Sequence, residues 1–111
     1  MRLLNHFPFH ASGSGEVTTL ACEIAARSAP LVWERVAHRV LQMSGSEARG
    51  YIRSRAAEAV QAEVDRTLRS EPRLRGWARA SLVNQAVDGV VERTLNETLR
   101  IQRSRSMRRA A

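Results

Sequence analysis

Apolar residues recur every three or four positions along most of this 111-residue chain, and no other feature constrains its fold as strongly. This spacing places the apolar side chains along one face of an α-helix. No segment alternates apolar and polar residues over the length of a β-strand, so no sheet is predicted. The pattern predicts an all-α fold, a bundle of about three long helices. The predicted stripes are Val17, Leu20, Ile24, Ser28 and Leu31, continued by Val32, Val36, Val40 and Met43; then Ile52, Ala56, Ala59, Val60 and Val64; and last Val83, Val87, Val90, Thr94, Thr98 and Ile101.

The first helix is predicted to follow an irregular arm at residues 1–15. The arm contains Pro8 and a flexible Ser-Gly-Ser-Gly segment, and either Ser12 or Ser14 of that segment can cap the helix. Pro30 lies within the first apolar stripe, where proline removes a backbone donor and disfavours helix at the residue before it. The first helix is therefore predicted to be kinked or broken at Pro30.

The second and third helices have boundary signals of their own. Ser44 and Glu47 are three residues apart, as in a capping box, and Pro72 should end the second helix near Ser70. After a short helix or turn, Ser81 is expected to cap the last long helix. The expected organisation is an irregular arm at residues 1–15, a helical domain at 16–99, and an Arg-rich C-terminal end at 100–111 that is partly helical or disordered.

The positive charge is concentrated at the C-terminal end. The formal net charge is +7 and every basic residue apart from histidine is Arg. Acids and arginines nearly balance in residues 16–99, whereas residues 100–111 contain no acid. Such an end can neutralise phosphates without reading a sequence, or it can be a disordered solubilising tail. Its arginines, all candidate nucleic-acid contacts, are Arg100, Arg103, Arg105, Arg108 and Arg109.

A second group of arginines surrounds Trp77. Arginine beside an aromatic ring can bind nucleic acid by phosphate contact and stacking, although such a group is more often a solvated junction between helices. The sequence leaves both interpretations open. The candidate contacts in this group are Arg66, Arg69, Arg73, Arg75 and Arg79.

The predicted core consists mainly of Ala, Val and Leu, with few large side chains. Gly89 lies inside the last stripe, where glycine disfavours helix by roughly 1 kcal/mol relative to alanine, and it is consistent with close packing of another helix. Long amphipathic helices with small side chains favour a homo-oligomer that completes the core. Trp33, Tyr51 and Trp77 are the candidate interface anchors, because interfaces favour large aromatic residues.

No residue pattern predicts an enzyme, a cofactor or a metal site. His6 and His10 are separated by Pro8 and have no further ligands nearby. Cys22 lies between apolar residues with no histidine placed to act as its base, so a buried, unreactive thiol is expected. Glu34 and His38 have the spacing of an ordinary pair on one helix face.

Location and function follow only in outline. A single cysteine cannot form an internal disulfide, the N-terminus has no signal-peptide pattern, and no apolar run has the length of a membrane span, so a cytoplasmic protein without membrane contact is expected. The favoured function is a small, non-enzymatic helical interaction or oligomerisation module whose partner is itself or another protein. The alternative is an accessory protein that binds nucleic acid through its arginines.

Overall fold

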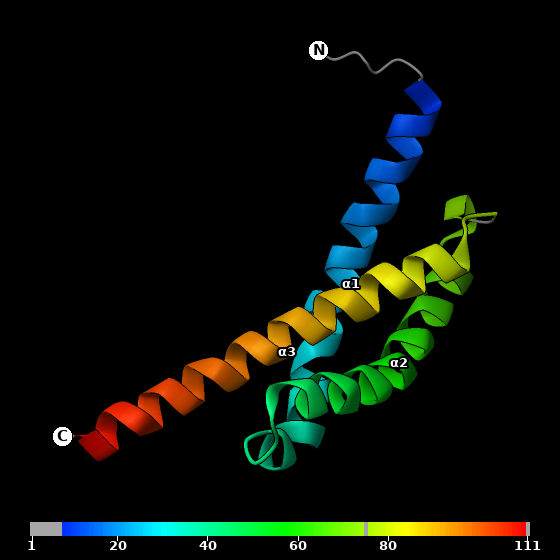
Figure 1. Cartoon of the computed structure of the whole chain (residues 1–111). Helices are drawn as coiled ribbons and strands as arrows, with labels where there is room; N and C mark the ends of the chain where they lie inside the picture. Colours follow the sequence, from blue (N-terminus) through cyan, green and yellow to red (C-terminus); the bar gives the residue numbers. More distant parts are fainter. Residues whose placement is uncertain (1–7, 75, 111) are drawn as a thin grey trace.

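The computed structural model describes residues 8–74 and 76–110 and shows three long helices joined by two short segments (Figure 1). Helix α1 spans Pro8–Val40, α2 spans Gly45–Ser70 and α3 spans Arg79–Ala110, with a 3₁₀ turn, η1, at Pro72–Leu74. No strand occurs within these described residues. The predicted all-α, three-helix architecture is confirmed.

Helix α2 begins and ends where its local sequence predicts. The backbone N–H of Glu47 donates to Ser44 Oγ at 3.4 Å, and the Glu47 carboxylate accepts from the Ser44 N–H at 3.0 Å. This reciprocal capping box satisfies two backbone donors that a helix start otherwise leaves unpaired. The same hydrogen bonds lower the pKa of Glu47. The helix ends at Ser70, two residues before Pro72.

Helix α1 differs from the prediction at two points. It begins at Pro8 rather than at a cap on Ser12 or Ser14, since proline is tolerated in the first turn of a helix. Residues 1–7 of the predicted arm lie outside the described residues. Helix α1 also continues through Pro30, so the predicted break is wrong, whereas the alternative of a kink stays a prediction. Pro30 itself is exposed, while Ser28 and Val32 on either side of it are buried and hold the segment against the other helices.

Helix α3 begins at Arg79, two residues before the predicted cap at Ser81. The Leu82 N–H already donates to the Ala78 carbonyl at 3.1 Å, so Ser81 lies within the first turn. The helix then runs without interruption to Ala110. The Arg-rich residues 100–110 are therefore helical.

The core forms where all three helices contact one another. Its members follow the predicted stripes closely, with one exception on α1. The buried position after Ser28 is Val32, four residues on, so Leu31 is more than half exposed rather than buried as predicted. The core cluster comprises Ala21, Ile24, Ala25, Val32, Val36, Val40, Ala48, Ile52, Ala56, Val60, Val64, Leu82, Val83, Ala86, Val87, Val90 and Val91.

Gly89 lies where α3 packs closely against α1. A Cβ atom added at Gly89 would lie 2.8 Å from the Cβ of Ala25, closer than two carbon atoms can pack. Only glycine at this position allows the two backbones their present separation. The close helix packing suggested by a glycine inside a helical stripe is confirmed.

The molecule is elongated. Its radius of gyration is 17.0 Å, whereas a compact domain of this length has a radius of gyration of about 13 Å. Its dimensions are 55 × 33 × 20 Å. The N-terminal part of α1 and the C-terminal end of α3 project from the region where the helices cross (Figure 1). Both projecting parts therefore have less of their surface covered by the rest of the chain.

Candidate functional site

The arginines around Trp77 lie at the end of α2, in η1 and at the start of α3. Most of those described have carboxylate partners: Arg66 pairs with Glu63, Arg73 with Glu71, and Arg79 with Asp65. Arg69 is exposed and forms no ion pair with the described residues, and Arg75 lies outside them. We refer to Arg66, Arg69, Arg73 and Arg79 as the junction cluster.

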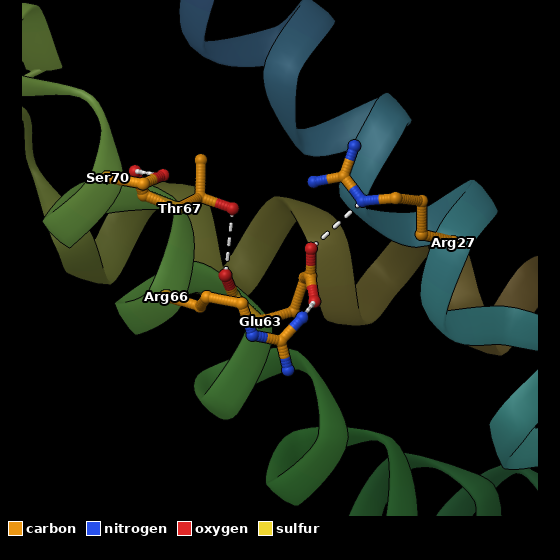
Figure 2. Close-up of polar contacts among 5 residues, drawn as sticks. All are labelled: Arg27, Glu63, Arg66, Thr67 and Ser70. Atoms are coloured by element: carbon orange, nitrogen blue, oxygen red, sulfur yellow. Dashed lines mark hydrogen bonds and ion pairs between the residues drawn. The ribbon is translucent and has the colours of Figure 1, made fainter.

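Glu63 connects the junction cluster to α1 (Figure 2). Its carboxylate accepts from Arg27 Nε of α1 at 2.9 Å and also from Arg66, one helical turn along α2. The Glu63 side chain is only 16% exposed, so its two guanidinium partners supply the contacts that solvent cannot. Arg66 thus belongs to a network that fixes α1 against α2.

Asp65 performs a similar role between α2 and α3. Arg79 donates to both carboxylate oxygens of Asp65, at 2.7 and 3.1 Å. These hydrogen bonds, with the nearby positive charges, lower the pKa of Asp65. The guanidinium of Arg79 is consequently engaged within the fold, and its charge is compensated at the surface.

Trp77 is half-buried within this junction. Its backbone N–H donates to the Leu74 carbonyl at 3.0 Å, which holds the segment after η1 in place. Its side chain lines a shallow depression of about 470 Å³ together with Leu68, Pro72 and Asp65. The ring is partly covered by its own chain. Of the two charged residues that line the depression with it, Asp65 pairs with Arg79, whereas Arg69 forms no ion pair with the described residues.

The C-terminal end of α3 has a different electrostatic character. Arg100 pairs with Glu97, and Glu97 is the last acid of the sequence. No acid therefore follows it to offset the charge of the remaining arginines. The next four arginines are exposed, and none forms an ion pair with a carboxylate of residues 8–74 or 76–110. We call this surface the basic end, defined by Arg103, Arg105, Arg108 and Arg109.

A groove lies against the basic end. It has a volume of about 670 Å³ and is open to solvent. Leu41, just after α1, forms one wall, and α3 supplies the others. All of the α3 side chains that line it can donate hydrogen bonds: Gln102, Arg105, Ser106, Arg108 and Arg109.

The three aromatic candidates have separate surroundings. Trp33 is half-buried and lines an apolar hollow of about 270 Å³ between α1 and α3, beside Ala29 and Pro30. Tyr51 is also half-buried, and its ring lies 5.9 Å from the Arg39 guanidinium carbon and 5.3 Å from that of Arg55. Trp77 lies in the junction described above. Of the three, Trp33 is the one beside an apolar concavity.

Sequence patterns missed three large apolar side chains on the surface. Leu31, Leu99 and Met107 are 54%, 47% and 73% exposed. Leu99 lies four residues after Leu95, which packs against the core, so it continues an apolar row beyond the part of α3 that the other helices cover. The exposure of Leu99 depends on where those helices end, which periodicity alone does not specify.

Cys22 is exposed, so the predicted burial of its thiol is wrong. The buried face of α1 passes through Ala21 and Ala25, and Cys22 is turned towards α3, where Arg93 Nη2 lies 3.8 Å from its Sγ. Within the described part of the chain, no three His, Cys, Asp or Glu side chains are grouped as metal ligands.

Comparisons with protein-family models, with curated proteins and with solved structures find no match to this chain. Among the helices of residues 8–74 and 76–110, none combines the length and apolar character needed to cross a bilayer. The described residues thus form an elongated, all-α, three-helix protein. Three of the four arginines of its junction cluster are ion-paired, whereas the four arginines of the basic end form no ion pair with the described residues.

Proposed function

We propose that this protein is a small, non-enzymatic helical interaction module that associates with a second copy of itself. The observation that carries the proposal is its elongated shape, with a radius of gyration of 17.0 Å where a compact domain would have about 13 Å. Its projecting helix ends are not covered by the rest of the chain, and pairing with another copy would bury their exposed apolar side chains.

The surface of the helices supports this proposal. Large apolar side chains are exposed at Leu31, Leu99 and Met107, and Trp33 borders an apolar hollow formed by two helices. Burying such side chains against a partner is favourable by about 25 cal/mol per Å² of apolar surface removed from water. Trp33 is therefore the best placed of the three aromatic candidates to act as an anchor.

The non-enzymatic part of the proposal rests on the surroundings of the reactive side chains. The neighbour of Cys22 Sγ is the guanidinium of Arg93, which is always protonated and cannot act as a base. Glu34 and His38 are both exposed on α1, without the enclosed setting in which acid–base pairs are usually found. A cytoplasmic location is proposed with it, because a single cysteine gives no internal disulfide.

Multi-angle light scattering over a wide concentration range tests self-association. We expect a mass of at least twice 12.4 kDa for the intact protein. Replacing Leu31, Leu99 and Met107 together by Gln should shift the mass towards 12.4 kDa, while replacing exposed Gln61 and Asn84 by Ala should not. A monomeric intact protein at every concentration would refute the proposal, and an unchanged mass in the Gln variant would refute the surface assigned to it.

A further inference from the structure

The basic end of α3 carries an inference that is independent of self-association. We propose that it binds the phosphate backbone of a nucleic acid duplex without reading its sequence, with the backbone held in the groove beside Leu41.

The basic end carries positive charge that no acid of the described residues neutralises. Arg103, Arg105, Arg108 and Arg109 are exposed, and no carboxylate of the described residues pairs with them. Like charges held together on one short helical segment repel one another, and a polyanion relieves that repulsion. Since duplex DNA carries a negative charge about every 1.7 Å of its axis, it can present several phosphates to this segment at once.

The second step is the direction of the side chains. Buried Thr94 and Thr98 lie on the face of α3 that packs into the core. Ile101, Arg105 and Arg108 follow at spacings of three or four residues, so they continue the same helix face beyond the core. One face of α3 thus packs against α1 and α2 in the core. Where α3 projects beyond the core, the same face carries arginines.

The third step is the chemistry of the groove. Its α3 wall offers guanidinium groups, the Gln102 amide and the Ser106 hydroxyl, all of which can donate to phosphate oxygens. Guanidinium groups bind phosphate with two parallel hydrogen bonds, which gives arginine an advantage over a point charge. No acidic side chain is among the described residues that line the groove, so an anionic backbone meets no opposing side-chain carboxylate from them.

The fourth step separates nucleic acid from an acidic protein. Protein interfaces also use arginine, but their centres rely on aromatic or apolar anchors, whereas Leu41 is the one apolar side chain among the described residues that line this groove. Interfaces with DNA are more polar and far more positively charged. None of the described lining residues is aromatic, so none offers a ring on which an unpaired base could stack, which favours a duplex over a single strand.

The test is fluorescence anisotropy with a labelled DNA duplex of mixed sequence, titrated at several salt concentrations. Replacing Arg105, Arg108 and Arg109 together by Gln removes three charges from the groove. The matched control replaces Arg66, Arg73 and Arg79 by Gln, which removes the same charge from the junction cluster. Circular dichroism checks that both variants keep their helix content.

For the intact protein we expect a log–log salt slope of about −3, as three phosphate contacts would give. The basic-end variant should lose more than about tenfold in affinity and most of that slope, while the control stays within a few-fold of the intact protein. Equal losses in the two variants would overturn the proposal, because binding would then follow net charge rather than a site.

Two further outcomes would also overturn it: no binding by the intact protein at low salt, or binding of poly-glutamate as tight as that of the duplex. The second result would identify an acidic protein surface as the partner. Light scattering on the same samples reports self-association separately, so failure of nucleic-acid binding leaves that proposal standing and the reverse also holds.

Discussion

The junction cluster and the basic end contain the same residue type at similar density, yet their charges are in different states. At the junction, Asp65 and Glu63 engage Arg79 and Arg66 and connect neighbouring helices. At the basic end, the sequence has no acid after Glu97, and α3 projects beyond the region where the helices cross. The comparison shows that formal charge and available charge are separate quantities.

The difference also distinguishes arginines that join two helices by ion pairs from arginines whose charge faces solvent. Pairs between helices, such as Arg53 with Asp88 at 2.8 Å and Arg49 with Glu92 at 3.2 Å, each contribute about 0.2–1 kcal/mol at an exposed position. They position the helices and present little free charge to a partner. The arginines of the basic end form no such pairs with residues 8–74 or 76–110 and keep their charge available.

The largest expected effect concerns the scaffold that carries both regions. Gly89→Ala places a Cβ 2.8 Å from the Ala25 Cβ, so α1 and α3 must move apart, and the free energy of unfolding should fall by about 1–3 kcal/mol despite the better helix propensity of alanine. Urea unfolding monitored by circular dichroism measures this change.

The double variant Gly89→Ala with Ala25→Gly is the control for that prediction, because it restores the space at the crossing. It should recover part of the lost stability relative to Gly89→Ala alone. If Gly89→Ala is as stable as the intact protein, the helices do not approach each other as closely as described.

The next largest effect is expected when the arginines of the junction cluster lose their acidic partners and so come to resemble those of the basic end. Asp65→Asn with Glu71→Gln removes the partners of Arg79 and Arg73 and leaves their charges free. Affinity for a DNA duplex at low salt should rise by roughly threefold to tenfold, because added free cations release more counterions on binding. Replacing exposed Glu34 of α1 and Glu58 of α2 by Gln gives the same change in net charge without removing an acid beside the junction cluster. An equal rise in that control would show that pairing at the junction has no influence on binding.

The smallest effect is the pH dependence of the Asp65–Arg79 pair. The hydrogen bonds from Arg79 lower the pKa of Asp65 in the folded state, so the pair stabilises the fold above the ordinary aspartate pKa of about 3.9. That contribution should be lost as the pH falls through the lowered folded-state pKa. Asp65→Asn should therefore have a lower urea midpoint than the intact protein near neutral pH, and the two midpoints should converge in acid. A constant difference down to low pH would contradict this assignment.

The sequence predicted the helices where the determining interactions are local. The capping box of Ser44 and Glu47 spans three residues, and the buried stripe of α2 follows directly from its period. Leu31 and Cys22 were placed wrongly because several faces of α1 carry apolar residues, and only the crossing of α3 at Ala25 selects the buried one. Periodicity cannot make that selection without knowing the partner helix.

The basic end could be predicted from the sequence, because residues 100–111 contain arginines and no acid. The basic end follows from the lack of any acid after Glu97. The ion pairs of the junction cluster could not be predicted in this way. Arg79 pairs with Asp65 fourteen residues away, and Glu63 pairs with Arg27 of another helix. The groove beside Leu41 likewise requires the turn after α1 to lie against α3, which is a tertiary contact.

The salt dependence of duplex binding after removal of residues 102–111 tests most directly whether the basic end is the nucleic-acid contact. This truncation deletes the basic end and the groove, leaves Arg100 paired with Glu97, and keeps the whole junction cluster. The account predicts that the log–log slope falls from about −3 to near zero while helix content in the remaining chain persists. A truncated protein that binds the duplex as tightly as the intact one, with the same slope, would contradict it and assign the contact to the junction cluster.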